Sequence, residues 1–97
     1  MSSMLNGSQL VTADGVLGIS GQAKIVYSIH ILSGGGGGGV VLLRRGTAVG
    51  DTIGISQTGT TSIGVTFNYE GGMYFPAGCF VDVDANVTSV LVSYREA

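Results

Sequence analysis

The amino-acid sequence predicts an all-β protein, a single β-sandwich of about seven or eight short antiparallel strands in a jelly-roll or other Greek-key arrangement. Three observations predict this class. Apolar and polar residues alternate with a period of two in several short stretches, as in strands with one face on a core. Turn-forming residues separate these stretches at intervals of about 8 to 12 residues. No stretch has the helical period of about 3.6 residues.

Residues 1–14 are predicted to form an N-terminal arm that precedes one domain over residues 15–97. The arm is polar and contains two turn signals, Asn6-Gly7 and Asp14-Gly15. It is either mobile or ordered by lying on a neighbouring subunit. With 97 residues in all, the chain is too short for two domains with separate cores.

Residues 16–20 form a short strand candidate, and residues 23–32 form the strongest strand of the first half. Positions 25, 27, 29 and 31 carry large apolar side chains and are predicted to face the core. The opposite face begins at Lys24 and includes His30. Because this second face also carries apolar residues, the strand is predicted to be central in its sheet and partly covered on both sides.

Six consecutive glycines separate this strand from an apolar run at residues 40–45. The two strands are predicted to form a hairpin with a glycine-rich tip at residues 34–39. Ordering six glycines costs about 3–6 kcal/mol more than ordering six alanines, so the tip is expected to be mobile in an isolated monomer. A phosphate-binding loop is excluded because such a loop precedes a helix, whereas this one precedes a strand.

Three further strand candidates follow at residues 51–57, 62–69 and 73–75. Gly71-Gly72 is predicted to separate the second from the third. Pro76 is predicted to end the third strand, which has the features of an edge strand because proline cannot donate to a neighbouring strand.

The last quarter of the chain shows the clearest alternation. Residues 79–84 alternate Cys or Val with Phe or Asp, and residues 87–94 alternate again after a polar turn. No glycine or proline interrupts these two stretches. They are predicted to pair as a hairpin, against which the rest of the chain packs.

The composition predicts a subunit of a larger assembly. Charged residues make up 10% of the chain and the mean hydropathy is +0.47, against about 25% charged residues in ordinary soluble domains. Weak self-repulsion favours association.

A net charge of −2 with four basic residues excludes nucleic acid as a partner. The longest apolar run, Val40–Leu43, is far too short to span a membrane. No secretory signal is found and Cys79 is the one cysteine, so we expect folding in a reducing cytoplasm without secretion.

No residue cluster predicts an enzyme, a cofactor or a metal site. His30 and Cys79 are single and have no partners of catalytic or zinc-binding type nearby in sequence. Asp82, Asp84 and Asn86 begin like a calcium-binding loop, but the sixth position lacks glycine and the twelfth lacks glutamate. A calcium site of another kind at this turn is an alternative to a plain polar turn. The two aspartates also share a face, yet a glycosidase needs a sugar cleft, and the chain has no Trp.

Several stretches resemble small all-β proteins of tailed bacteriophages. These are Gly-Val-Thr-Phe-Asn at 64–68, Phe-Pro-Ala-Gly-Cys-Phe-Val-Asp-Val-Asp-Ala at 75–85 and Val-Leu-Val-Ser-Tyr at 90–94. The resemblance implies a virion structural protein, and within that group a capsid decoration (cement) protein. The implied partners are the major capsid protein and copies of this chain. The alternative is a tail-fibre, spike or other receptor- or glycan-binding module, in which exposed tyrosines would form a sugar platform. The candidates are Tyr27, Tyr69, Tyr74 and Tyr94.

The arm, the glycine tip and two adjacent arginines are the predicted contact segments. Adjacent strand residues point to opposite faces, so the two arginines are not expected to form one patch. One of them either pairs with an acidic residue of a partner subunit or is solvated. The candidate interface residues are Gly34, Gly35, Gly36, Gly37, Gly38, Gly39, Arg44 and Arg45.

Overall fold

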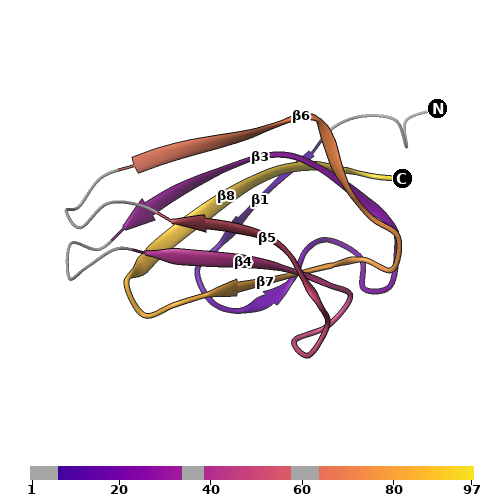
Figure 1. Ribbon diagram of the computed structural model, residues 1–97, viewed down its shortest axis with the longest axis horizontal. Coiled ribbons are helices and arrows are strands. Elements are labelled where there is room, and N and C mark those ends of the chain that lie inside the picture. Colours follow the sequence, from indigo (N-terminus) through magenta and orange to yellow (C-terminus); the bar gives the residue numbers. More distant parts are fainter. Residues whose placement is uncertain (1–6, 34–38, 58–63) are drawn as a thin grey trace.

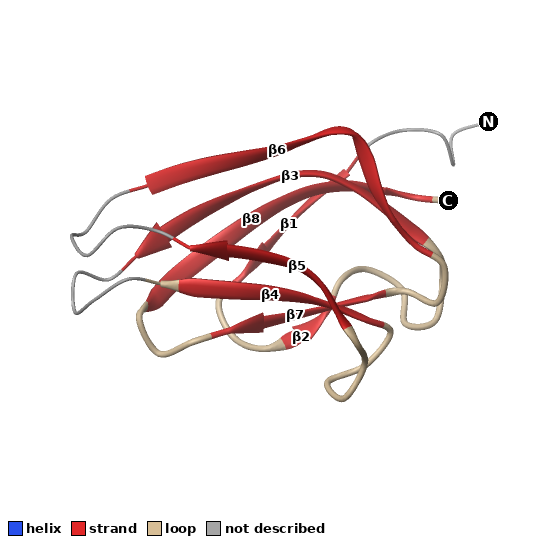
Figure 2. Cartoon of the chain, in the orientation of Figure 1, coloured by secondary structure: helices blue, strands red, loops and turns tan. Residues whose placement is uncertain are grey.

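Eight strands make up the regular structure of the described residues. The computed structural model describes residues 7–33, 39–57 and 64–97, and in this part of the chain Figure 2 shows strands and loops but no helix. The strands are β1 (Gly7–Val11), β2 (Gly15–Val16), β3 (Lys24–Ser33), β4 (Val40–Arg45), β5 (Thr52–Gln57), β6 (Gly64–Phe75), β7 (Cys79–Val83) and β8 (Val87–Glu96). The prediction of an all-β protein is confirmed.

The strands form two antiparallel sheets of four strands each. Sheet I has the order β1-β8-β3-β6 and sheet II the order β2-β7-β4-β5; the two layers can be followed in Figure 1. Among the described strands, β4 and β5 are the only neighbours in a sheet that are also consecutive along the chain. Every other pairing joins strands that lie apart in the sequence.

The two sheets share one hydrophobic core. Its members come from the inward positions of both sheets, and the fully buried apolar side chains are Leu17, Val26, Ile29, Ile31, Val41, Leu43, Phe75, Cys79, Val81, Val90 and Val92. The predicted inward faces of residues 79–83 and 90–94 are confirmed, because Cys79 and Val81 are buried and Val83 packs against the core, as do Val90 and Val92.

Both predicted hairpins are wrong. β3 lies in sheet I and β4 in sheet II, so these two strands do not pair as a hairpin. β7 and β8 are separated in the same way. Alternation along a strand shows which side chains face the core, but it has the same form whether the next strand lies beside it or across the core. The polar turn at residues 84–86 therefore crosses from one sheet to the other.

β3 is central in sheet I, as predicted, but its inward face changes partway along. Its register against both neighbours shifts between Val26 and Ser28. As a result Lys24 and Val26 face inward before the bulge, and Ile29 and Ile31 face inward after it. The prediction that positions 25 and 27 face the core is wrong, because an extra residue at a bulge reverses the phase of the alternation.

β6 runs without a break through Gly71 and Gly72, where the sequence predicts a separation. Both glycines have positive φ, 81° and 87°, opposite the bulge in β3. They bend β6, which pairs with β3 on both sides of the irregularity. β6 lies at the edge of sheet I, which agrees with the predicted edge character of its last residues.

Alanine substitutions of these two glycines separate the cost of a positive φ from the cost of a steric clash. Gly71→Ala meets no atom within 4 Å, so it should cost only the positive φ, about 1–2 kcal/mol of unfolding free energy. Gly72→Ala adds a clash with Ile25 and a close contact with the Tyr27 ring, 3.2 Å away, and should cost about 2–5 kcal/mol. Urea denaturation of both variants checks the order; equal losses would contradict the clash.

The N-terminal segment is part of the fold from Gly7 onward. β1 pairs with β8, from Gly7 opposite Tyr94 to Val11 opposite Val90, and Val11 is buried. Residues 7–11 of the predicted arm therefore belong to sheet I of this chain. Residues 1–6 lie outside the described residues.

Candidate functional site

Of the predicted glycine tip, Gly34–Gly38 lie outside the described residues, and Gly39, directly before β4, is buried. The backbone at this end is fixed by Asp84, whose Oδ2 accepts a hydrogen bond from the N–H of Val40 at 3.0 Å. The described end of the glycine run is therefore joined to the turn between β7 and β8.

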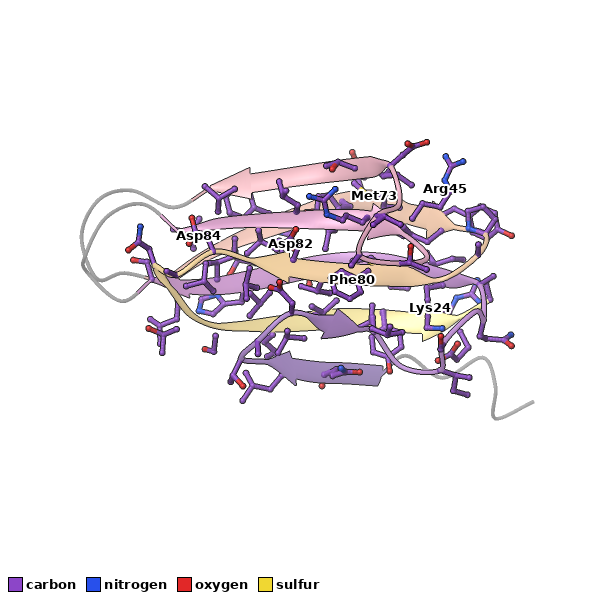
Figure 3. The ribbon with its side chains drawn as sticks, turned by 90° about the horizontal axis from the view of Figure 1, so that it is seen from below. Lys24, Arg45, Met73, Phe80, Asp82 and Asp84 are labelled. Carbon is purple, nitrogen blue, oxygen red and sulfur yellow. The ribbon has the colours of Figure 1, made fainter. Side chains whose placement is uncertain are left out.

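The two adjacent arginines have different environments. The Arg44 Nε donates to Asp82 Oδ2 at 2.9 Å, and its Nη1 donates to Thr52 Oγ1 at 3.2 Å. Arg44 thus links β4 to both of its neighbours in sheet II. Arg45 is exposed at the end of β4, far along the molecule from Asp84 in Figure 3. Of the two, Arg45 is the side chain available to a partner.

The aspartates around the last turn hold the backbone in place. Asp84 Oδ1 accepts from the N–H of Asn86 at 2.8 Å, and Asp14 Oδ1 accepts from the N–H of Val83 at 2.8 Å. Asp82 is paired with Arg44. Within residues 7–33, 39–57 and 64–97, no three His, Cys, Asp or Glu side chains come together as metal ligands do. These contacts account for the aspartates as turn and sheet-stabilising groups.

Lys24 is the residue that sequence reasoning missed. Its side chain is fully buried, and its Nζ donates to the carbonyl oxygens of Ile19 and Gln22, both at 2.6 Å. The third partner is Glu96, whose Oε1 lies 2.8 Å from Nζ. Nζ thus makes two hydrogen bonds to backbone carbonyls and one ion-pair contact, and among the described residues Glu96 Oε1 is buried without a hydrogen-bond donor of its own. This arrangement joins the β2–β3 loop, β3 and the end of β8 at one end of the molecule (Figure 3).

The space around this ion pair is filled by neighbouring groups. A Cβ on Gly18, whose φ is 60°, would lie 2.7 Å from Glu96 Oε2 and 3.0 Å from the Tyr94 hydroxyl oxygen. Burial, followed by the nearby Glu96 charge, raises the pKa of the Tyr94 hydroxyl. The only signal in the sequence was that Lys24 is the single lysine and begins an apolar strand. Its partner could be found only once β3 and β8 were known to pair.

Cys79 is a core residue with a protonated thiol. It is fully buried, and burial raises its pKa to about 12 against the opposing effect of the Lys24 charge. The thiolate is the reactive form, so the thiol should resist alkylation by iodoacetamide at pH 8 in the folded protein and react after unfolding. Rapid modification of the folded chain, followed by mass spectrometry, would contradict this placement.

The same shift has a consequence at alkaline pH. The unfolded chain releases the thiol proton near pH 9, the ordinary value, while the folded chain keeps it up to about pH 12. Unfolding then becomes more favourable as pH rises above about 9. Urea denaturation between pH 8 and 10 should show a steeper loss of stability than in Cys79→Ala, and parallel curves would contradict the prediction.

The remaining candidate residues lie on the outer face of sheet I or pack on the core. His30 is exposed, with Nδ1 2.7 Å from Thr66 Oγ1. Among the tyrosines, Tyr74 is 58% exposed. Tyr69 and Tyr94 pack against the core, and the Tyr27 hydroxyl accepts a hydrogen bond from Arg95 Nε at 2.8 Å. The four tyrosines therefore do not form one exposed platform.

No ligand pocket is found around the described residues, and none of their segments is a helix long and apolar enough to cross a membrane. Comparison of the chain with known protein families, with curated proteins and with solved structures gives no match.

Proposed function

We propose that this chain is a virion structural protein of a tailed bacteriophage, a capsid decoration protein that binds the outer shell through protein–protein contacts. The observation that carries the proposal is the strand order. β1, β2, β3 and β4 pair with β8, β7, β6 and β5 respectively. A long two-stranded ribbon rolled into two sheets would have this pairing. We infer from it a jelly roll, a fold used by viral capsid proteins and lectins.

The composition and the resemblance of residues 64–68, 75–85 and 90–94 to phage proteins support the same proposal. One fold serves many functions, so the choice of a virion protein rests on the composition and the resemblance as well as on the fold. Charged residues make up only 10% of the chain, so copies of it repel one another weakly, which suits a subunit packed among neighbours. Its partners would be the major capsid protein and other copies of this chain, in the virion.

The decisive measurement is the copy number in purified particles. Quantitative mass spectrometry against the major capsid protein should find hundreds of copies per particle. A few copies to about a dozen would place the chain in the tail or portal, and absence from the particle would overturn the proposal.

Arg45 is the described residue of the predicted interface that a partner can reach. Arg45→Glu should weaken capsid binding in a sedimentation assay without lowering the melting temperature. Arg44→Glu is not a suitable probe, because Arg44 is paired within sheet II. Replacing Gly34–Gly38 by serines and deleting residues 1–6 test the other two contact segments. A longer N-terminal deletion would remove β1. Normal decoration by all three variants would show that the contacts lie elsewhere.

The alternative is a receptor- or glycan-binding module of a tail fibre or spike. Lectins share the proposed fold, and Tyr74 is exposed on the outer face of sheet I. The other three tyrosines are packed on the core or held by Arg95, which favours the decoration protein. Binding to a glycan array that is lost in Tyr74→Ala would support the alternative.

A further inference from the structure

The outer face of sheet I gathers most of the exposed large apolar side chains of the described residues. Leu10 is 62% exposed, Leu32 39%, Tyr74 58% and Leu91 44%. Each of them alternates with inward-facing neighbours in its strand. The remaining two exposed residues of this kind, Ile19 and Val49, lie in loops. The clustering on one face distinguishes these side chains from scattered surface residues.

The leucines and His30 are neighbours across the sheet. Leu10 lies opposite Leu91, Leu91 opposite His30, and His30 opposite Thr66, so one row crosses all four strands. Leu32 lies in the next row, opposite Ser89. Directly opposed side chains have Cβ atoms about 4.5–5.5 Å apart. Leu10, Leu91, His30 and Leu32 therefore form one continuous patch, which we call the leucine patch.

The rows around the leucine patch are almost free of charge. The next row consists of Ser8, Ser93, Ser28 and Asn68, in this order across the sheet. Arg95 lies further along β8 and is held by Tyr27, while the exposed Glu70 lies where β6 bends. The outer face of sheet II, by contrast, contains the Arg44–Asp82 ion pair. A face without net charge meets no electrostatic repulsion from a copy of itself.

We propose that a second copy of this chain packs on the outer face of sheet I, with the two leucine patches in contact about a two-fold axis. Two-fold dimers use one self-complementary patch, which a neutral apolar face provides. Three strands of about ten residues and the five-residue β1, about 4.8 Å apart and with about 3.3 Å per residue, give a face of roughly 550 Å² in projection. Since accessible area exceeds projected area, this is comparable with the roughly 800 Å² per partner of a stable interface.

This inference rests on the part of the proposed function that places copies of the chain side by side, and it names the surface between them. Its test uses the isolated full chain without a capsid. A failure of the dimer therefore leaves capsid binding untouched, and a failure of capsid binding leaves the dimer untouched.

Analytical ultracentrifugation over a range of concentrations tests the proposal. The wild-type chain should dimerise with a dissociation constant of roughly 10 µM or below. Leu91→Asp should weaken the dimer about 100-fold, because the two-fold axis buries two new carboxylates together. The matched control is Val49→Asp, since Val49 is 93% exposed in the β4–β5 loop and should leave the dimer unchanged. A wild-type monomer at 200 µM, or equal dimerisation of wild type and Leu91→Asp, would overturn the proposal.

Cross-linking gives a second readout that does not depend on a destabilising charge. The native Cys79 is buried, so it does not compete in an oxidation experiment. Leu91→Cys should form a disulfide-linked dimer under mild oxidation, whereas Val49→Cys should remain monomeric. Equal cross-linking of the two variants would indicate random collision and would overturn the face-to-face arrangement. A dimer detected by sedimentation that Leu91→Cys does not capture would place the interface on another surface.

Discussion

Replacing Lys24 by methionine should destabilise the fold by about 3 kcal/mol or more. Methionine has a similar length and fills much of the same volume, so the loss isolates the ammonium group from packing. Without it, the carbonyl oxygens of Ile19 and Gln22 lose their hydrogen-bond donor, and the buried carboxylate of Glu96 loses its counter-charge. Net stabilities of single domains are about 5–15 kcal/mol, so the variant would lose a large part of its total.

The matched control removes the second ion pair of the described residues. Arg44 and Asp82 have side chains 24% and 29% exposed, and water can replace the lost partner. Arg44→Met should therefore cost about 1 kcal/mol or less. Urea denaturation of both variants at pH 7 gives the comparison. A loss in Lys24→Met no larger than in Arg44→Met would show that the buried acceptors are satisfied by other means.

Glu96→Gln separates the charge from the rest of the Lys24 site. The two hydrogen bonds from Nζ to backbone carbonyls remain, so the loss should be smaller than in Lys24→Met. Because the Glu96 side chain is 28% exposed, water also screens part of this interaction. We expect about 1 kcal/mol, measured by the same denaturation. A smaller loss in Glu96→Gln than in Lys24→Met would indicate that the hydrogen bonds to the backbone carbonyls account for most of the stabilisation by Lys24.

Phe75→Ala should cost about 3–5 kcal/mol, the usual result of truncating a fully buried aromatic side chain. Phe75 is among the largest fully buried side chains of the described residues and lies opposite Lys24 at the end of β6. The cavity would open beside the ion pair, so part of the loss should come from weaker contacts of Lys24. Thermal and urea unfolding of the variant measure the change.

The adjacent residue provides the control for Phe75. Tyr74→Ala removes an aromatic ring of similar size from the outer face, where Tyr74 is 58% exposed, and should cost less than about 1 kcal/mol. Both variants carry the same change of backbone propensity in the same strand. Similar losses in the two variants would mean that the inward and outward faces of β6 are not assigned correctly.

The sequence predicts features that belong to a single strand. The alternation of residues 79–83 correctly identified Cys79 and Val81 as inward-facing, because the side-chain period of an isolated strand requires no knowledge of its neighbours. The central position of β3 and the edge position of the end of β6 also follow from local composition.

Features that need two strands could not be predicted. The bulge in β3 is visible only in its register against β6 and β8, both far later in the chain, and it moves Lys24 to the inside. The pairing of Lys24 with Glu96 depends on β3 lying beside β8. Among the proposed contacts, Arg44 is occupied by Asp82 from another strand, which no local pattern indicates.

The position of β8 between β1 and β3 also determines the order in which the protein can assemble during synthesis. β1 has β8 as its partner in sheet I, so the first strand made must wait for the eighth before its backbone groups are paired. Contacts between such distant residues close slowly, and folds dominated by them form in milliseconds to seconds. We expect an emerging chain that ends before Val87 to leave β1 unpaired and to form only the β3–β6 part of sheet I.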